Sequence, residues 1–559
     1  MSFVANENQQ ISLTDSFSTQ SLRTQKFVEN SWAKGFAEIV FPAINEERFS
    51  VLYSDKASRP NTPVNAVIGS LILKEMFDLT DDELLASILC DLRFQYALHT
   101  TSYTEQPFSD RTFSRFRERL YRYYENYSCD LLKEEMQDIA KIFCQYLRLQ
   151  PGMKRMDSVM VSSNSKKMSR LEIAYTCVAN MVKAIHRTGE DTLLSGKLEH
   201  YLDADDCNRT IYHRKNEGLT DRLTQVLQDA HTLLAAMGEG YEELPEYLLL
   251  HRMFNEQAVV DANGELKARE NENIATTSMQ NPSDPDATYR KKAGKDHKGY
   301  VANLVETFDD QHTVITGYDY APNIHSDSEF CKETITSLGK CEEKTTLITD
   351  GAYGSVENVQ LAASNNIELV TTALTGSLPD EILAEFKLDE STHDVLTCPM
   401  GVHPYKVKYN PATESYRVSF HKHDCENCPL REKCKAKIQK KSAIVIVSAK
   451  SVQRANYMKT LSTPKYKELS RKRNGVEALP SLLRRKYGID NMPVRGFVRS
   501  KIWFGFKIGA INVKKVLVAA KERALPLVDL FFSTFLRAFW LLAGMMLNRN
   551  RSKFRLVTL

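Results

Sequence analysis

The sequence predicts a chain of mixed α and β structure, in which short strands are separated by long helical regions. Three observations lead to this prediction. Residues 153–163 and 298–320 show the β-branched, alternating pattern of strands. Helix start signals recur through the first 150 residues, beginning with the Thr-Pro pair at residues 62–63. Four cysteines within residues 398–434 are grouped as in a small metal-stabilised module.

The length and the charge of the chain limit the classes of protein to which it can belong. A chain of 559 residues is too long for one ordinary domain, so we expect two to four. Apolar residues make up 42% and charged residues 26%, as in soluble globular proteins. The net charge is +3, but residues 466–515, which we call the basic block, hold 13 Lys and Arg against three acids. This block indicates a polyanion partner or, alternatively, a solvated helix surface.

Neither a membrane span nor export is predicted. The N-terminus lacks the apolar run of a signal peptide, and the odd number of cysteines, 11, suits a reducing cytoplasm. Residues 525–547 are strongly apolar, but Pro526, Asp529 and Arg537 interrupt them. We therefore expect a buried or partner-contacting helix there, because charges in the middle of a membrane span are costly.

The N-terminal part is expected to contain a disordered or extended arm, residues 1–40, and a helical domain, residues 41–148. The Thr-Pro pair at 62–63 caps one helix, a capping box at residues 80–83 begins another, and the Ser-Asp pair at 109–110 caps an arginine-rich one. Short helices that end in a basic one suit a DNA-binding unit of the helix-turn-helix type, or alternatively a bundle with a charged outer face. Its candidate DNA-binding residues are Arg111, Arg115 and Arg117.

The rest of the chain alternates between strand and helix patterns. No period of 20 to 50 residues repeats, which argues against a solenoid. The expected segments are a first core strand (149–169), a helical insertion (170–278), later core strands (279–390), a cysteine-rich insertion (391–450), a segment with the core helix that carries Glu477 and the basic block (451–520), and a C-terminal apolar helix with a basic tail (521–559).

Three acids stand out by their positions. Asp157 lies inside a predicted strand, Asp350 ends another, and Glu477 lies in the basic block. An acid at the end of a buried strand is costly unless something pairs with it. Three converging carboxylates repel one another, and a divalent metal such as Mg²⁺ resolves the repulsion. Taken singly, Asp350 suits a turn with Gly351, Asp157 suits a loop cap, and Glu477 suits an ion pair with Arg473.

The cysteine spacing resembles that of structural zinc ligands. The pattern is C-x2-C-x5-C, with a fourth thiol 27 residues upstream. Two closely spaced thiols on a tight turn supply half of a tetrahedral Zn²⁺ site, and no open position for catalysis is evident. The alternative is a set of reduced cysteines around a β-hairpin. The candidate ligands are Cys398, Cys425, Cys428 and Cys434. The histidines that offer a substitute for one thiol are His403, His421 and His423.

Several segments together, in order along the chain, resemble the transposases of bacterial insertion sequences. These are RMDSVMVSSNSKK, SDPDATYRKKAGKDHKGYVANLVE, LITDGAYGS, CPMG with CENCPLREKC, and RKRNGVEALPSLLRRKYG with RSKIWFGFKIGAINVKK. AVIGSLILKEMFDLTDDELLASILCDLRFQYAL resembles the helical N-terminal domain of the same proteins. The resemblance is to the insertion sequence 1182 family within the broad DDE group, and it runs from about residue 45 to about 520.

The resemblance implies an RNase H-like core of α+β type and a function. Matched motif by motif, the catalytic acids are Asp157, Asp350 and Glu477, holding Mg²⁺ or Mn²⁺. The implied activity is binding of terminal inverted repeats, phosphodiester cleavage and strand transfer into target DNA. The implied partners are DNA and a second copy of the chain on it, in the bacterial cytoplasm beside the nucleoid. A domesticated, non-catalytic DNA-binding protein and a metal-dependent nuclease without strand transfer are the alternatives.

The broader group often carries Tyr, Arg and Lys around the Glu. Arg473 fits that spacing, while Ser470 stands at the Tyr position and Arg484 at the Lys position. An Arg keeps the charge, but a guanidinium does not contact phosphate as an ammonium does. Trp503 and Phe504 suit a core position better than stacking on a displaced base. The candidate DNA-binding residues of this region are Arg473, Arg484, Arg485, Lys486, Arg495, Arg499 and Lys501.

Overall fold

A computed structural model describes residues 1–7, 15–54, 56, 58–194, 196–213, 218–260, 264–292, 294–372, 378–389 and 394–522. The expected C-terminal apolar helix and basic tail lie outside the described residues. The chain divides into two compact units. Of the described residues, the first unit holds those within 1–150, 307–316 and 502–522, and the second unit holds those within 151–306 and 317–501. No helix among the described residues is long and apolar enough to cross a membrane.

The first unit is helical, as the start signals predict. The predicted capping box is present: the Thr80 amide donates to Glu83 Oε2 (2.8 Å), and the Glu83 amide donates to Thr80 Oγ1 (3.2 Å). The long helices are α1 (Leu22–Glu29), α3 (Val64–Phe77), α4 (Asp81–Cys90), α5 (Leu92–Ala97), α6 (Thr112–Tyr127) and α7 (Leu131–Leu147).

Three details of the first unit differ from expectation. The extended arm is wrong for residues 16–40, which form short helices because apolar side chains such as Val28 and Phe36 are buried there. Pro63 itself is the N-cap of α3, one residue later than predicted. No side chain caps α6, since Ser109 bonds to Thr112 instead.

The last described helix, residues 497–522, lies mostly in the first unit. Trp503 and Phe504 are 7% and 0% exposed, so the expectation of a core position is confirmed. Lys507 is also buried and pairs with Glu75 of α3 at 2.7 Å. This ion pair and the apolar contacts fix the helix to the N-terminal helices.

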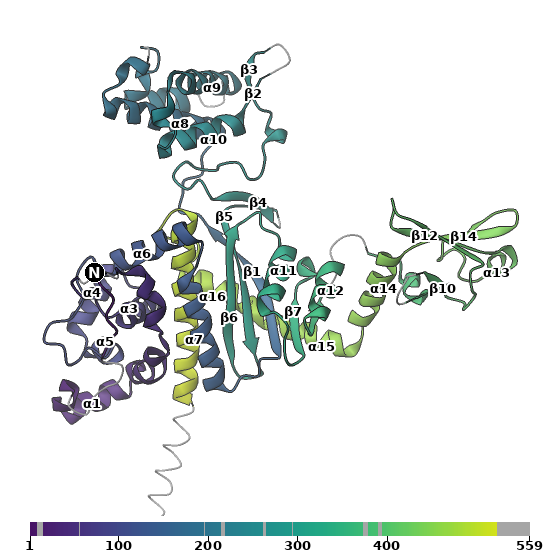
Figure 1. Cartoon of the computed structure of the whole chain (residues 1–559), viewed down its shortest axis with the longest axis horizontal. Coiled ribbons are helices and arrows are strands. Elements are labelled where there is room, and N and C mark those ends of the chain that lie inside the picture. Colours follow the sequence, from purple (N-terminus) through teal and green to yellow (C-terminus); the bar gives the residue numbers. More distant parts are fainter. Residues whose placement is uncertain are drawn as a thin grey trace, which may run out of the picture. The chain divides into compact units, whose positions relative to one another are not determined.

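The main sheet is six-stranded and mixed (Figure 1). Strand order is β4-β5-β1-β7-β8, and β6 also pairs with β5. β1 and β7 are parallel, as are β7 and β8, while β4 and β5 are antiparallel. The strand predicted at 153–163, the strand pattern of 298–320 and the strand predicted before Asp350 are all present. The bounds are β1 (Met153–Ser162), β4 (Thr288–Lys292), β5 (Lys295–Phe308), β6 (Thr313–Pro322), β7 (Thr345–Thr349) and β8 (Ile367–Thr371).

Alternation along β1 separates the two faces of this sheet. Met156 and Met160 enter an apolar core with Phe330 of α11 (Asp327–Leu338) and Ala362 of α12 (Val356–Ser364). Arg155 and Asp157 therefore point to the opposite face. That face meets η12 (Asn474–Glu477). Just before η12, the Lys472 carbonyl accepts a hydrogen bond from Arg155. The turn that carries the third acid thus lies over the strand that carries the first.

Two further parts of the second unit have cores of their own. The region predicted as a helical insertion buries Met181, Leu227 and Leu250 between its helices and adds an unpredicted hairpin, β2-β3. Its elements are α8 (Arg170–Thr188), α9 (Leu219–Ala236), α10 (Pro245–Gln257), β2 (Ala258–Val260) and β3 (Leu266–Ala268).

The cysteine-rich region is built on a four-stranded antiparallel sheet of order β11-β12-β14-β13. Its strands and short helix are β9 (Lys387–Leu388), β10 (Val395–Thr397), β11 (Lys406–Asn410), β12 (Ser415–His421), α13 (Lys422–Glu426), β13 (Lys437–Ile438) and β14 (Ser442–Ser448). Three helices follow: α14 (Ala449–Leu461), α15 (Pro464–Arg473) and, after η12, α16 (Ala478–Tyr487). The basic block begins within α15.

Candidate active site

The three acids singled out in the sequence meet at one guanidinium group. Arg473 Nη2 lies 4.0 Å from Asp157 Oδ2 and 3.7 Å from Asp350 Oδ2. Arg473 Nη1 lies 3.2 Å from Glu477 Oε1. The Arg473 side chain is only 14% exposed, whereas Asp350 and Glu477 are about half exposed at 47% and 58%. The fold therefore brings carboxylates from three distant segments to one partly open site.

Asp157 is the most buried of the three, at 18% exposure. One carboxylate oxygen accepts from the Ser158 amide at 2.9 Å. Burial raises the pKa of this carboxyl, and the nearby charge of Asp350 acts in the same direction. The Ser158 amide, Arg473 and Lys292 act against that rise by favouring the charged form. Asp157 therefore releases its proton at a higher pH than an ordinary aspartate, and additional positive charge would favour its ionised form.

Asp350 lies just after β7, at the carboxyl end of that strand. Its Oδ1 accepts from the Gly351 amide at 2.6 Å and from the Thr372 hydroxyl at 3.2 Å. The turn expected from the Asp-Gly pair is therefore present, and it leaves Oδ2 to face Arg473. Turn formation and membership of the acidic site are compatible roles for this residue.

Glu477 ends η12 and directly precedes α16. Pro480 is the third residue of α16, a position where its missing amide proton breaks no helical hydrogen bond. The predicted ion pair between Arg473 and Glu477, four residues apart, is present. Because Arg473 also faces both aspartates, this pair belongs to the larger cluster and is no isolated helix-surface contact.

Sequence reasoning missed the residue that holds this turn in place. Arg155 lies two residues before Asp157 on the same face of β1. Its guanidinium pairs with buried Glu306 at 2.9 Å, and its Nη1 donates to the Lys472 carbonyl at 3.0 Å. A Cβ on Gly475 would lie 2.8 Å from Arg155 Cζ and closer still to Nη1. The available signal in the sequence was Gly475, two residues before Glu477. The hydrogen bond between Arg155 and the Lys472 carbonyl spans 317 positions, so local patterns do not predict it.

Lys292, at the end of β4, is a second cation that sequence reasoning missed. Its Nζ lies 3.5 Å from Ser158 Oγ and 3.7 Å from Asp327 Oδ2. It also contributes positive potential at Asp157. Because its side chain is 44% exposed, it stands at the open side of the acidic cluster, where an anionic ligand is accessible to it.

The predicted DNA-binding residues of the basic block lie in different surroundings. Arg484 faces Asp490 at 3.5 Å, and Arg485 donates to Ser481 at 2.8 Å. Arg495 donates to the Asn164 carbonyl at 2.7 Å, and Lys501 lies 5.8 Å from the centre of the Phe497 ring. Those that are classed as exposed are Arg484, Arg485, Lys486, Arg495 and Arg499.

On helix α6 of the first unit, the three predicted arginines are not equivalent. Arg111 and Arg115 are exposed, whereas Arg117 forms an ion pair with Asp81 at the start of α4. The fold therefore uses Arg117 to join two helices, and it leaves Arg111 and Arg115 facing solvent within this unit.

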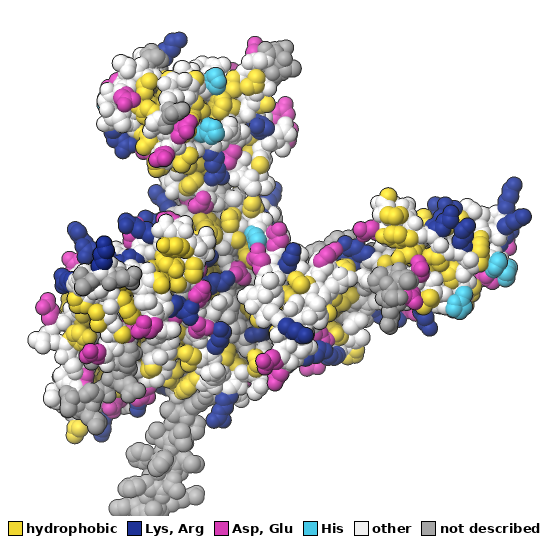
Figure 2. All heavy atoms as spheres, viewed as in Figure 1, with side chains coloured by type: hydrophobic (Ala, Val, Ile, Leu, Met, Phe, Trp, Pro, Cys, Tyr) yellow, Lys and Arg dark blue, Asp and Glu magenta, His cyan; other side chains and the backbone are white. Residues whose placement is uncertain are grey.

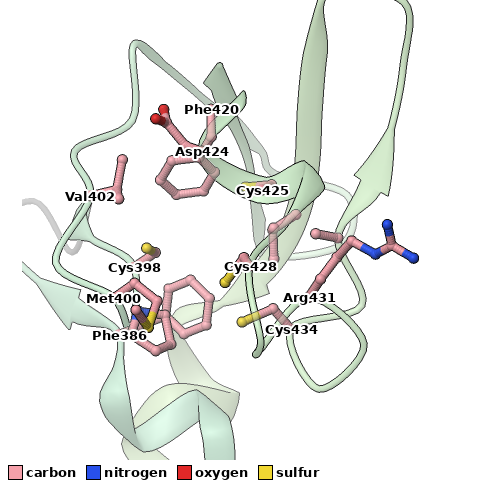
Figure 3. A pocket seen from close by; sticks show the side chains of 13 residues that line it. Phe386, Cys398, Met400, Val402, Phe420, Asp424, Cys425, Cys428, Arg431 and Cys434 are labelled. Carbon is pink, nitrogen blue, oxygen red and sulfur yellow. The ribbon is translucent and has the colours of Figure 1, made fainter. Parts of the chain in front are cut away.

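The four predicted zinc ligands line one small cavity of about 20 Å³ (Figure 3). Burial raises the pKa of Cys434 to about 11, and the neighbouring thiols act in the same direction. All 11 cysteines are free of disulfides. The three candidate histidines do not line this cavity. Within the described ranges, no three or more His, Cys, Asp or Glu side chains are set out as ligands of one metal ion, either here or at the acidic cluster.

Comparison with known families gives two matches. Residues 397–517 match the family described as "Transposase DDE domain", and residues 24–119 match the one described as "Transposase domain (DUF772)". No curated protein and no solved structure matches the chain. The first match includes Arg473 and Glu477. Together the matches support a DNA-cutting transposase of DDE type. Such a family implies DNA as the partner and divalent metal ions as cofactors.

Proposed function

We propose that the chain is the transposase of an insertion sequence of the 1182 family, with an RNase H-like core. The observation that carries this proposal is the convergence of Asp157, Asp350 and Glu477 on one guanidinium. The strand arrangement supports the core assignment, since β1 lies between β5 and β7 and runs parallel to β7. The acids then occupy the first strand, the end of a later strand and the start of a helix.

The donor set suits Mg²⁺ or Mn²⁺. Carboxylate oxygens are the hard ligands that these ions prefer, and two of the three side chains are about half exposed. Bound metal ions would activate water or a 3′-OH and stabilise the leaving oxygen of the phosphodiester. Arg473 offsets part of the same negative charge. If a bound metal neutralised the carboxylates, the Arg473 guanidinium would be able to bind phosphate oxygens in bidentate fashion.

The remaining residues hold and orient DNA. Helix α6 reads the terminal inverted repeats through Arg111 and Arg115, and the basic block binds phosphates through its exposed arginines and lysines. Lys292 lies beside Asp157, at the position where a scissile phosphate would approach. Two copies of the chain bind the two ends of the element, because both ends must be held together for their joint insertion.

The direct test is a cleavage assay with the full chain. The substrate is a duplex that carries the DNA flanking the chain's own reading frame, incubated with Mg²⁺. The proposal expects a nick that leaves a 3′-OH at the element end, followed by joining of that end to target DNA. A nick without joining would favour the metal-dependent nuclease. Binding without any nick would favour the non-catalytic protein, whose expected mark, loss of one acid, is absent from this sequence.

We also propose that the cysteine cavity holds structural zinc. Four thiols line one space large enough for a single ion: Cys425 lies in α13, Cys428 just after it, Cys434 in the following turn and Cys398 just after β10. A bound Zn²⁺ would draw in and deprotonate the thiols despite the raised pKa of Cys434. The Val418 and Phe420 side chains form the apolar floor against which the cysteine turns pack.

Cys428→Ser should lower both the zinc content and the melting temperature of the purified protein. Wild type should carry about one zinc per chain, as expected for a closed four-ligand site. Cys341→Ser, a thiol outside the cavity, should leave both quantities unchanged. Metal analysis and thermal denaturation measure the two effects. A folded, active wild-type protein without zinc would refute this assignment.

Replacing Arg484, Arg485 and Lys486 together by Ala should weaken binding to any DNA sequence. Each lost phosphate contact should reduce the slope of log K against log salt concentration by about 0.9. Preference for the element end should survive, because phosphate contacts carry no direct sequence information. Titrations at several salt concentrations with cognate and random duplexes measure this. An unchanged slope would remove this segment from the DNA interface.

A further inference from the structure

The cysteine-rich sheet presents an outer face that the active site and the zinc cavity do not use. Along β12, Tyr416, Val418 and Phe420 point inward to the apolar core, so Arg417 and Ser419 point outward. The strand register then places the side chains of the neighbouring strands in rows across this face. One row is Lys408, Arg417 and Ile446, and the next is Lys406, Ser419, Ile444 and Lys437.

All the charged members of these two rows are basic. Lys406, Lys408, Arg417 and Lys437 are exposed, and none of them has an ion pair or side-chain hydrogen bond with any described residue. Ile444 lies between them and is only 8% exposed, as expected where long aliphatic stems cover it. Figure 2 shows Lys and Arg side chains gathered over this region. Residues 394–448 hold ten Lys and Arg against five acids, a net charge of +5.

The pairing of Lys408 with Arg417 is unfavourable for the isolated sheet. These residues lie directly opposite each other on adjacent strands, where like charges are destabilising. Folding alone gives no reason to place two unpaired cations there. An anion bound across the two strands would turn this repulsion into attraction. Neighbouring strands are about 4.8 Å apart, so the face offers several cations to a row of phosphates.

From this geometry we propose that the outer face of the β11-β12-β14-β13 sheet binds the phosphate backbone of DNA. This inference rests on the proposed function, because it takes DNA as the polyanion that the chain handles. The contacts are made by three flexible lysines and one arginine, which bind phosphate oxygens through their positive charge. They therefore hold DNA without reading its sequence. The site is additional to the basic block and to helix α6.

The test compares two triple variants of the full chain. In the first, Lys406→Gln, Lys408→Gln and Arg417→Gln remove three of the four charges of the face but keep stems that cover Ile444. In the control, Lys422→Gln, Lys435→Gln and Lys459→Gln make the same change in net charge outside this face. The control residues already have partners in the protein: Lys422 pairs with Glu426, Lys435 with Asp380, and Lys459 with Glu385.

Binding of a fluorescent random-sequence duplex is titrated from 50 to 300 mM salt. The face variant should lose roughly 0.9 in salt slope for each lost contact, and on the order of tenfold or more in affinity at 100 mM salt. The control should stay close to wild type. Equal losses in both variants, or none in the face variant, would overturn the inference. Either outcome would leave the proposed function unaffected as long as wild type binds and cleaves DNA. If wild type binds no DNA, both proposals fail.

Thermal denaturation gives a second readout that needs no DNA. Lys408→Gln removes one partner of a like-charge pair, so at low salt it should melt at the same or a higher temperature than wild type. Adding duplex DNA should raise the melting temperature of wild type more than that of the variant. A clear loss of stability without DNA would mean that the lysine serves the fold, and it would contradict the proposed role.

Discussion

Asp157→Asn, Asp350→Asn and Glu477→Gln should each reduce DNA cleavage by about a thousandfold or more, with DNA affinity almost unchanged. Each change removes one carboxylate of the proposed metal site while keeping the shape of the side chain. Metal ions supply several kcal/mol of transition-state stabilisation, and each 1.36 kcal/mol corresponds to a factor of ten in rate. Single-turnover cleavage and a binding titration measure the two quantities. A variant that cleaves at close to the wild-type rate would exclude that residue from the site.

Stability provides the control for these variants. Because the pKa of Asp157 is raised in the folded protein, folding favours the protonated carboxyl. The contribution of this residue to stability is therefore greatest at low pH, and it declines as pH rises through the raised pKa. At neutral pH the metal-free Asp157→Asn protein should melt no lower than wild type. Loss of cleavage in this variant then reports on chemistry, whereas a fall in melting temperature would point to misfolding.

Gly475→Ala should reduce cleavage by about a hundredfold while the protein remains folded. The added methyl group would lie 2.8 Å from Arg155 Cζ. That guanidinium cannot move away freely, because buried Glu306 and the Lys472 carbonyl both hold it. The η12 turn must shift instead, and it carries Glu477 out of place. A displacement of about 1 Å at a reacting centre is enough for such a loss.

The matched control is Gly238→Ala, at a glycine with negative φ and open surroundings. This change should leave cleavage and melting temperature close to wild type. For Gly475→Ala, we expect the unfolding free energy to fall by on the order of 1–3 kcal/mol, as is typical of overpacking, and the melting temperature to fall modestly with it. Full activity in Gly475→Ala would show that the position of the turn does not matter for the chemistry.

The sequence alone was enough to find several strands and caps, because these depend on local patterns. Alternation predicts β1, and the box at Thr80 predicts the start of α4. The polar N-terminal segment led to the wrong prediction of a disordered or extended arm. A few buried apolar side chains such as Phe17 and Val28 suffice to fix short helices there. The local i, i+4 rule predicts the Arg473–Glu477 pair. It cannot predict that the same guanidinium also reaches Asp157 and Asp350.

The positions of the three acids follow from the resemblance to insertion-sequence transposases, because single carboxylates have too many ordinary uses. The residues that surround the three acids in the folded protein cannot be predicted from local sequence patterns. Arg155 contacts a carbonyl 317 positions away, and Lys292 reaches Asp157 only through the sheet. The basic outer face of the cysteine-rich sheet likewise needs the register, since Lys408 and Arg417 become neighbours only when β11 and β12 pair.

The central claim, that the three carboxylates share a metal site, is tested most directly by exchanging the ligand atom. Asp350 is exposed enough to be replaced by Cys without burying a new group. A thiolate is a softer ligand than a carboxylate and binds Mg²⁺ poorly but Mn²⁺ better. We predict that Asp350→Cys loses cleavage in Mg²⁺ and regains a substantial part of it in Mn²⁺, while wild type cleaves with either ion. Wild-type activity of the variant in Mg²⁺, or inactivity with both ions despite normal DNA binding, would contradict it.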